Sequence, residues 1–218
     1  AEAIWRRRAA AAPTDWVARH NLSLALAQQD RWAEAGAQAV AAFVQRPDEP
    51  AVLRNVVLTL SRAGYTPTAV AEVTRSGPVR EVALRFSPAR WQCALGISVT
   101  LAALAFALVL FNVYGRRRRV LLLVLAGVSL GCAVLGTTVS LLSLHAYGAA
   151  KDARAVIVWK AGSLRSIPTV ADTTQKTSPL PAGTVAIADK PFPGWVRLVF
   201  DDGQTGWVPV EDTVSLWR

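Results

Sequence analysis

The stretch YGRRRRVLLL, residues 114–123, sets four consecutive arginines between two long apolar runs. The run before it, Trp91–Tyr114, and the run after it, Val120–Tyr147, contain no Asp, Glu, Lys or Arg. A helix needs roughly 20 apolar residues to cross a hydrocarbon core of ~30 Å, and Trp or Tyr at its ends suits the membrane interface. The sequence therefore predicts a two-helix transmembrane hairpin over residues 91–147. A pair of buried helices in a soluble protein is the alternative.

The loop between the runs carries the signal for orientation. Short loops rich in arginine stay in the cytoplasm, and this one contains Arg116, Arg117, Arg118 and Arg119. We therefore predict a bacterial inner-membrane protein with two passes, a cytoplasmic arginine loop and both terminal parts in the periplasm. Contact with anionic membrane lipid is compatible with this role. Nucleic-acid binding is disfavoured, because no interleaved aromatic residues or recognition fold accompany the arginines.

The composition agrees with this division of the chain. Of 218 residues, 52% are hydrophobic and 18% charged, and the net charge is +9. Residues 1–88 carry eleven Lys or Arg against eight Asp or Glu, and residues 148–218 carry eight against seven, so nearly half of the net charge lies in the arginine loop. The sequence has no Met and begins AEAIW, from which we expect either that processing removed an N-terminal segment or that this sequence is part of a longer protein.

Small residues recur at four-residue spacing inside both apolar runs. Gly127 and Gly131 form one pair, and Ala103 and Ala107 form another. Such pairs let helices approach closely, so we predict that they pack the two spans together. An interface with another membrane protein is the alternative.

Residues 1–76 contain a repeat of 34 positions. Pro13 matches Pro47, Asn21 matches Asn55, Leu26 matches Leu60 and Ala35 matches Ala69. A period of 34 is typical of tetratricopeptide repeats, and the chain resembles that family at the following positions: Asn21, Leu22, Trp32, Glu34, Ala35, Ala42 and Pro47. Residues 1–15 fit the second helix of a preceding repeat, so we expect further helices upstream of this sequence.

The resemblance implies a concave groove that binds a peptide. Its lining would be Val17, His20, Leu24, Gln28, Arg54, Leu58 and Arg62, with Asn21 and Asn55 placed to bond the peptide backbone. A purely structural role for the two asparagines is the alternative. Members of the family that clamp a terminal carboxylate have lysine where this chain has Val17 and Ala51, so such a ligand is disfavoured.

After residue 154 the pattern alternates with period two. The strands AVIVW, TVAIAD, WVRLVF and TGWVPV are separated by Gly, Pro and Asp, and Asp202-Gly203 indicates a hairpin. The segments SLRSIP, LPAGTVAIAD and GWVRLVFDDGQTGWVPV resemble a bacterial SH3-like barrel. Trp195 and Trp207 lie on either side of this last hairpin of the strands and would pack the barrel or contact a ligand. The chain lacks the asparagine of peptidoglycan-binding members.

The sequence contains no motif for catalysis, for a cofactor or for a metal. His20 and His145 are far apart, and no H-E-x-x-H, C-x-x-C, G-x-S-x-G or phosphate loop occurs. We therefore predict a protein that is not an enzyme.

The fold predicted is a multidomain membrane protein. An all-α tetratricopeptide part (1–76) and a linker (77–90) precede the transmembrane α-hairpin (91–147), and a second linker (148–154) precedes an all-β SH3-like barrel (155–218). This order of modules resembles the BatE-type proteins of the bacterial aerotolerance (Bat) system. The resemblance implies protein partners, namely membrane proteins with von Willebrand A domains and a MoxR-type ATPase.

These patterns predict a scaffold whose two periplasmic parts bind protein partners, in an aerotolerance or envelope-stress complex. An envelope sensor that binds peptidoglycan through the barrel is the first alternative. A regulatory subunit that acts on a membrane enzyme through its spans is the second.

Overall fold

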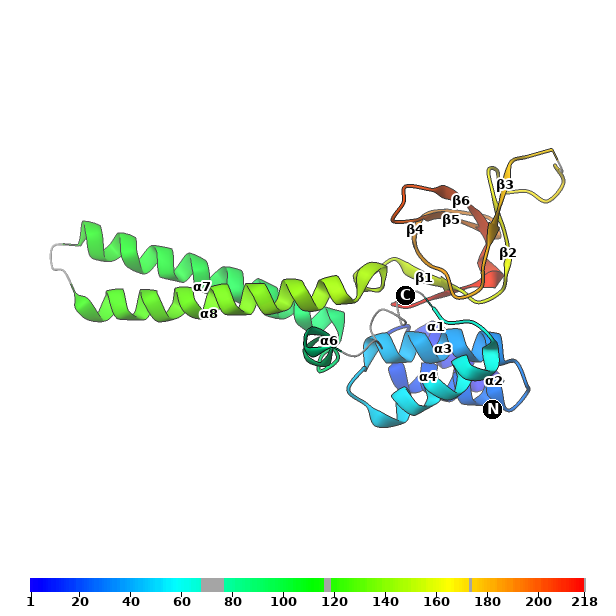
Figure 1. The fold of residues 1–218 in the computed structure, drawn as a ribbon, viewed down its shortest axis with the longest axis horizontal. Helices are drawn as coiled ribbons and strands as arrows, with labels where there is room; N and C mark the ends of the chain where they lie inside the picture. Colours follow the sequence, from blue (N-terminus) through cyan, green and yellow to red (C-terminus); the bar gives the residue numbers. More distant parts are fainter. Residues whose placement is uncertain (68–76, 116–118, 173, 218) are drawn as a thin grey trace.

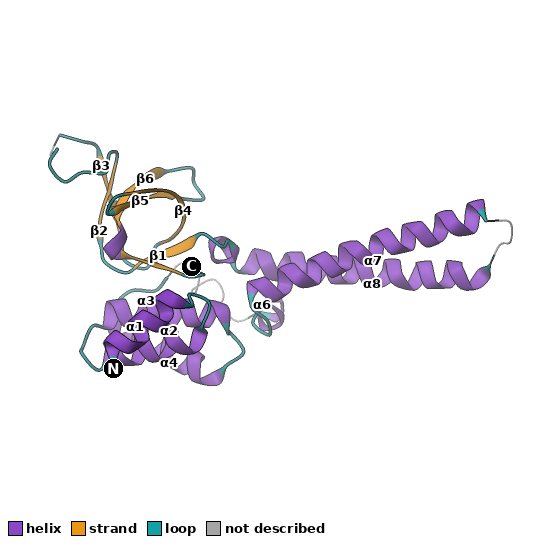
Figure 2. Cartoon of the chain, turned by 180° about the vertical axis from the view of Figure 1, so that it is seen from behind, coloured by secondary structure: helices purple, strands orange, loops and turns teal. Residues whose placement is uncertain are grey.

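The computed structural model describes residues 1–67, 77–115, 119–172 and 174–217. Within these residues, a group of N-terminal helices, a long two-helix hairpin and a C-terminal sheet follow one another along the chain (Figure 1). The N-terminal helices and the sheet lie side by side at one end of the hairpin (Figures 1 and 2). The opposite end of the hairpin is far from both.

The N-terminal helices are set by capping residues. Asp15 is an N-cap, because its carboxylate accepts hydrogen bonds from the backbone N–H groups of Val17 and Ala18 at 3.0 and 3.2 Å. Pro50 suits the first turn of a helix, and Gly64 ends that helix in the left-handed conformation. The helices are α1 (Glu2–Ala11), α2 (Trp16–Ala27), α3 (Trp32–Gln45) and α4 (Pro50–Ala63). Ala69, one of the repeat positions, lies outside the described residues.

Helix α3 is the core helix of this part. Every residue from Glu34 to Val44 is buried, and most of them are Ala, Gly or Val. A helix that is apolar around its whole circumference belongs in a core. Here α2 and α4 pack on one side of α3, and strand β7 (Thr213–Ser215) packs on another.

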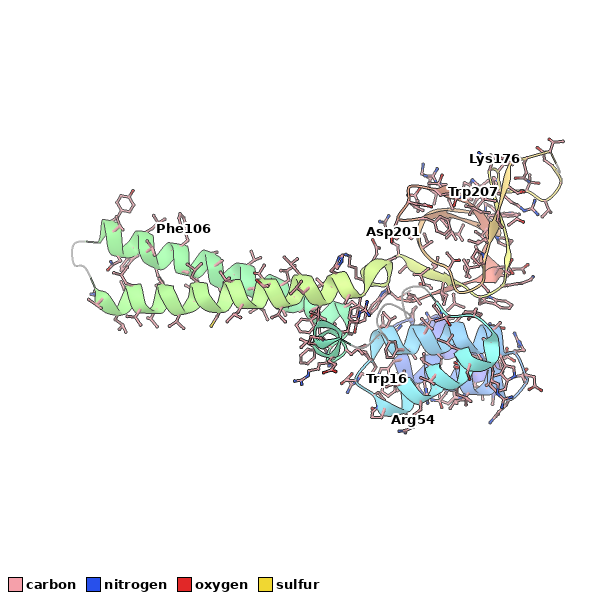
Figure 3. All side chains as sticks on the ribbon, viewed as in Figure 1. Trp16, Arg54, Phe106, Lys176, Asp201 and Trp207 are labelled. Atoms are coloured by element: carbon pink, nitrogen blue, oxygen red, sulfur yellow. The ribbon has the colours of Figure 1, made fainter. Side chains whose placement is uncertain are left out.

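Two helices of the described chain are long and apolar enough to cross a membrane. They are α7 (Pro88–Tyr114) and α8 (Val120–Ala146), with 27 residues each. Most of their surface is uncovered, and Phe106 projects away from the hairpin in Figure 3. The predicted hairpin is therefore present as a pair of long apolar helices.

The two helices meet along a seam with a seven-residue period. The seam positions are Trp91, Ser98, Ala105 and Asn112 on α7, and Ala126, Ala133, Ser140 and Tyr147 on and just after α8; Pro88, Ser143 and Leu144 are also buried, near the foot of the hairpin. A spacing of seven keeps one face of each helix toward its partner, as in a left-handed coiled coil. The small side chains in the middle allow close approach, since a Cβ added to Gly136 would lie 2.3 Å from the Oγ of Ser98.

The small-residue pairs singled out in the sequence lie elsewhere. Gly127, Gly131, Ala103 and Ala107 are exposed, and a Cβ on either glycine would meet no atom within 4 Å among the described residues. The prediction that these pairs pack the two helices together is therefore wrong. A four-residue spacing occurs on several faces of each helix, whereas the seven-residue period of buried positions follows one face only.

Asn112 closes the hairpin at its tip. Its Oδ1 accepts a hydrogen bond of 2.7 Å from the backbone N–H of Arg119, the residue before α8. An unpaired N–H is costly away from water, so the buried amide satisfies the beginning of α8. Arg119 is exposed, while Arg116, Arg117 and Arg118 of the predicted topological loop lie outside the described residues.

The described residues after 154 form a seven-stranded antiparallel sheet. Its order is β3-β2-β6-β5-β4-β1-β7, and the described strands β3 and β7 at its two ends are not paired with each other. The predicted barrel thus appears as an open, strongly curved sheet (Figure 1). The remaining strands are β1 (Ala155–Val158), β2 (Gly162–Arg165), β3 (Thr177–Leu180), β4 (Val185–Phe192), β5 (Trp195–Val199) and β6 (Thr205–Pro209).

The hairpin signal at Asp202-Gly203 is confirmed. Residues 200–204 connect β5 to β6, with Val199 opposite Thr205, and Gly203 takes a φ of +81° that favours glycine.

One hydrophobic core joins the helices, the foot of the hairpin and the sheet. Its members include Phe43, Ala83, Trp91, Tyr147, Ala150, Ile157 and Leu216. The segments 77–90 and 148–154, predicted as linkers, contain α6 (Pro78–Ala83), the first turn of α7 and the short helix η1 (Gly148–Lys151). Because Ala83 and Ala150 are buried in the shared core, both segments are structured parts of this junction.

Hydrogen bonds from side chains reinforce the junction. The Nε2 of Gln45 donates to the carbonyls of Pro13 at 2.9 Å and Leu216 at 2.8 Å. The indole Nε1 of Trp217 donates to the carbonyl of Ala150 at 2.8 Å. These bonds satisfy carbonyls that are covered when the sheet packs on α3.

A charge network fastens α1 to the other helices. The Nη2 of Arg6 lies 2.7 Å from a carboxylate oxygen of Glu2 and 2.7 Å from one of Glu34. Arg31 contacts the same two carboxylates, at 3.0 Å for Glu2. The hydrogen bond from Arg6 is the largest cause that lowers the pKa of Glu2 from 4.5 to about 2.

The seam predicts opposite outcomes for two glycines of α8. Gly136→Ile should destabilise the hairpin by about 1–3 kcal/mol, because the new side chain meets Ser98. Gly131→Ile is the matched control, since its side chain would point into open space. Thermal unfolding of the full chain in detergent measures both. Equal losses in the two variants would contradict the assigned seam.

The charge network predicts a pH-dependent stability difference. Since the folded pKa of Glu2 is below its unfolded value, the network stabilises the helices above about pH 4.5, and this contribution is lost as the pH falls toward 2. Glu2→Gln should therefore lower the urea midpoint at pH 7, and the difference from wild type should shrink between pH 5 and pH 2. Glu81→Gln, at an exposed carboxylate outside the network, should show no such trend. A gap between wild type and Glu2→Gln that stays constant with pH would contradict this assignment.

Candidate functional site

The predicted groove residues come from two neighbouring helices. Val17, His20, Asn21 and Leu24 lie on α2 and Gln28 is its C-cap, while Arg54, Asn55, Leu58 and Arg62 lie on α4, which packs beside it. The site residues that reach solvent are Leu24, Gln28, Arg54, Leu58 and Arg62. Figure 3 places Arg54 on the side of the helices that faces away from the sheet. This α2/α4 face combines exposed leucines with cationic side chains.

The two asparagines make contacts within the protein. The Nδ2 of Asn21 donates to the carbonyl of Val17 in its own helix at 2.8 Å. Asn55 is buried, and its Nδ2 donates to the Oγ of Ser23 at 2.9 Å, while Ser23 donates to the carbonyl of Ala35 at 2.8 Å. Asn55 thus links α4 to α2 and α3, which matches the structural alternative for this residue. Its buried Oδ1 has no hydrogen-bond partner among the described residues.

His20 lies half-buried at the edge of the same face. Its Nδ1 is buried and lacks a hydrogen-bond partner among the described residues. Burial lowers the pKa of the imidazole below 6.5, and the nearby carboxylate of Glu49 partly opposes the shift. Unlike Arg54 and Arg62 on the same face, His20 therefore offers polar contact without a fixed charge.

A cleft of about 1020 Å³ lies between the helices and the sheet, and the sequence analysis did not predict it. The helices contribute Arg6, Arg31, Trp32 and Arg62, and the sheet side contributes Trp159, Glu211 and Val214. Arg62 also stacks over the Trp32 ring at 5.7 Å. The residues of the two walls are far apart in the sequence, so the sequence did not predict the cleft. The one signal was Trp159, a large apolar residue at the end of AVIVW, which indicated that this part of the sheet is covered.

Arg19 is the buried cation of this cleft. It donates to the carbonyl of Pro13 at 3.2 Å and to the Oε1 of Gln38 at 3.0 Å. Burial lowers its pKa to about 10, so the guanidinium keeps its charge at neutral pH. The lining also includes Glu2 and Glu34, with which Arg6 and Arg31 form ion pairs.

The tryptophans of the sheet lie on its outer face. Trp195, Arg197 and Trp207 occupy one face of β5 and β6, while Leu198 and Val208 point into the inner core. Trp207 contacts Phe192 edge-on, with ring centres 6.1 Å apart, and Arg165 stacks over Trp195 at 6.0 Å. Both tryptophans are half-buried and neither joins the core clusters, so they belong to the surface.

The described residues contain no group of three or more His, Cys, Asp or Glu side chains placed to hold a metal ion. Comparison of the chain with family models, with curated proteins and with solved structures finds no match. The geometry of these three surfaces, the α2/α4 face, the cleft and the outer face of the sheet, is therefore the basis for assigning a function.

Proposed function

We propose that this chain is a two-pass membrane protein that acts as a non-enzymatic scaffold. The observation that carries the proposal is the shared core at the foot of the hairpin, which holds the helices and the sheet in one arrangement beside the apolar spans. A scaffold needs binding surfaces fixed relative to one another. Here the α2/α4 face and the outer face of the sheet point away from the junction and stay accessible.

In this proposal the N-terminal helices are tetratricopeptide repeats and the sheet is an SH3-like domain. The support for the first is recurrence, since α2 begins at Trp16 and α4 begins at Pro50, which is 34 positions later. The support for the second is the order of short antiparallel strands with the β5–β6 hairpin. The α2/α4 face would then hold a protein segment with apolar and acidic side chains, matching its leucines and arginines.

The arginine loop would orient the protein with both terminal parts in the periplasm of a bacterium. The resemblance to BatE-type proteins makes membrane proteins with von Willebrand A domains, and a MoxR-type ATPase system, the partners to test first. A role through the spans has less support, because the polar side chains Ser98, Asn112 and Ser140 are buried in the seam and Ser143 is buried beside α6.

One observation favours peptidoglycan binding as a second candidate function. Phe192, Trp195 and Trp207 place aromatic rings on the outer face of the sheet, and Phe192 is 51% exposed. Aromatic faces with neighbouring cations are surfaces on which sugar rings can stack. The sheet would then sense the cell wall while the helices hold a protein.

Photo-crosslinking in native membranes tests the scaffold. A photoreactive residue in place of Leu58, on the α2/α4 face, should give a discrete protein adduct that mass spectrometry identifies. The same replacement at Val170, an apolar position on the β2–β3 loop that is more exposed than Leu58, is the control and should give none. Leu58→Glu should reduce partner recovery at least tenfold. Equal adducts at both positions would count against the proposed groove.

Sedimentation with purified peptidoglycan tests the second candidate. If the outer face binds the wall, the full chain in mild detergent should sediment, and Phe192→Ala should weaken this at least fivefold. Val210→Ala, also exposed and apolar, should leave it unchanged. Sedimentation that both variants retain would exclude the aromatic surface as the binding site.

A further inference from the structure

Helix α6 and the turn after it leave large apolar side chains uncovered. Val79 and Phe86 are each 44% exposed, and Val82 is 38% exposed, although all three lie next to the buried Ala83. They lie at the foot of the hairpin, beside the much larger exposed apolar surface of α7 and α8. The described fold covers this patch with no other element, so its occupant must suit a surface continuous with the spans.

The orientation of α6 is fixed by hydrogen bonds from the hairpin. The Oη of Tyr147 donates to the carbonyls of Ala83 at 3.2 Å and Phe86 at 3.0 Å. The Nε1 of Trp91 donates to the same Ala83 carbonyl at 2.9 Å. These donors satisfy carbonyls at the end of a short helix, which would be costly to leave unpaired near lipid.

The helix axis runs across the hairpin. Figure 1 looks almost straight down α6, while α7 and α8 extend across the picture. Pro78, Val79 and Val82 pack toward Val139, Leu142 and Ser143 of α8 and line an apolar crevice of about 250 Å³ with them. If the hairpin stands upright in a bilayer, α6 therefore lies parallel to the membrane plane.

The level of α6 follows from the length of the spans. About 20 helical residues cross the hydrocarbon core. Counted from Val120 at the beginning of α8, they end near Val139, which is the residue that α6 packs against. The remaining turns of α8 rise through the headgroup layer toward Tyr147. The apolar patch thus lies at the boundary between hydrocarbon and headgroups.

Cationic side chains accompany the patch. Arg80, Arg85 and Arg90 fall within residues 77–90, a stretch of the sequence whose one acidic residue is Glu81. Arg85 and Arg90 are exposed, and Arg80 is half-buried. Arg90 also lies 4.0 Å from Asp48, and Arg80 has a further interaction within the protein. Arginines at headgroup level meet lipid phosphates, for which the planar guanidinium is well suited.

We propose that α6 and the turn after it form a membrane-embedded shelf, with Val79, Val82 and Phe86 in the outer hydrocarbon and with Arg80 and Arg85 against the phosphates of anionic lipid. This inference rests on the proposed function, in that it requires α7 and α8 to span a bilayer. The bilayer is chosen as occupant because the patch continues the lipid-facing surface and its charge is complementary to anionic headgroups. The shelf sets the depth of the hairpin and holds the junction down on the membrane surface.

Depth measurement by spin labelling tests the shelf and the spans separately. In the full chain with Cys93→Ser and Cys132→Ser, a nitroxide is attached at Val82→Cys, Phe106→Cys or Val170→Cys. The protein is reconstituted in nanodiscs of phosphatidylcholine and phosphatidylglycerol. The ratio of accessibility to oxygen over a water-soluble nickel complex should be highest at 106, lowest at 170 and intermediate at 82.

The two failures have different signatures. A label at 82 that matches the one at 170, while 106 is in lipid, overturns the shelf and leaves the spans in place. A label at 106 that matches the one at 170 overturns the spans, and the shelf with them.

The charge requirement has its own control. Phosphatidylglycerol should raise the thermal unfolding temperature of the wild type above that in pure phosphatidylcholine, and Arg80→Gln with Arg85→Gln should remove at least half of this shift. Lys176→Gln with Lys190→Gln removes the same charge from exposed positions of the sheet, and this variant should show the full temperature shift. Lys176 lies at the end of the sheet far from the hairpin (Figure 3). Equal loss in both pairs, or in neither, would overturn the contact with lipid phosphate.

Discussion

The fold depends on one hydrophobic core that three parts of the chain share. Phe43 of α3, Tyr147 at the foot of the hairpin and Ile157 of β1 belong to the same cluster. A sheet and a helical array joined only by flexible segments would move independently, as domains do when their interface is small. Here a hydrogen bond from Gln45 also links α3 to the chain beyond β7, so the α2/α4 face and the outer face of the sheet keep their relative positions.

The same junction explains how the hairpin can carry domains on one side. Ser98, Ala105, Ala133 and Ser140 bring α7 and α8 close together, and Trp91 and Tyr147 complete the seam where it leaves the apolar region. Their polar atoms then bond to Ala83 and Phe86. The same seven-residue pattern thus provides the close contact between α7 and α8 and, at the foot of the hairpin, the hydrogen bonds to Ala83 and Phe86.

Much of the fold could be predicted from the sequence, because its signals are local. The uncharged runs predicted the two long helices α7 and α8, and alternation in AVIVW and WVRLVF predicted strands β1 and β5. What failed depends on contacts between distant residues. From the sequence alone, the seam residues could not be distinguished from the small-residue pair Gly127 and Gly131. The hydrogen-bond partners of Tyr147 and Trp217 lie more than sixty positions away in the sequence. The cleft was missed for the same reason, since its two walls come from opposite ends of the chain.

The bond between Gln45 and Leu216 has a consequence for biosynthesis. The two residues are 171 positions apart, so the ribosome completes α3 long before β7 exists to cover it. In the meantime β1 must also wait for its neighbours β4 and β7. Since α2 and α4 cover α3 early, it is the side of α3 that packs on β7 that stays uncovered until the end of synthesis.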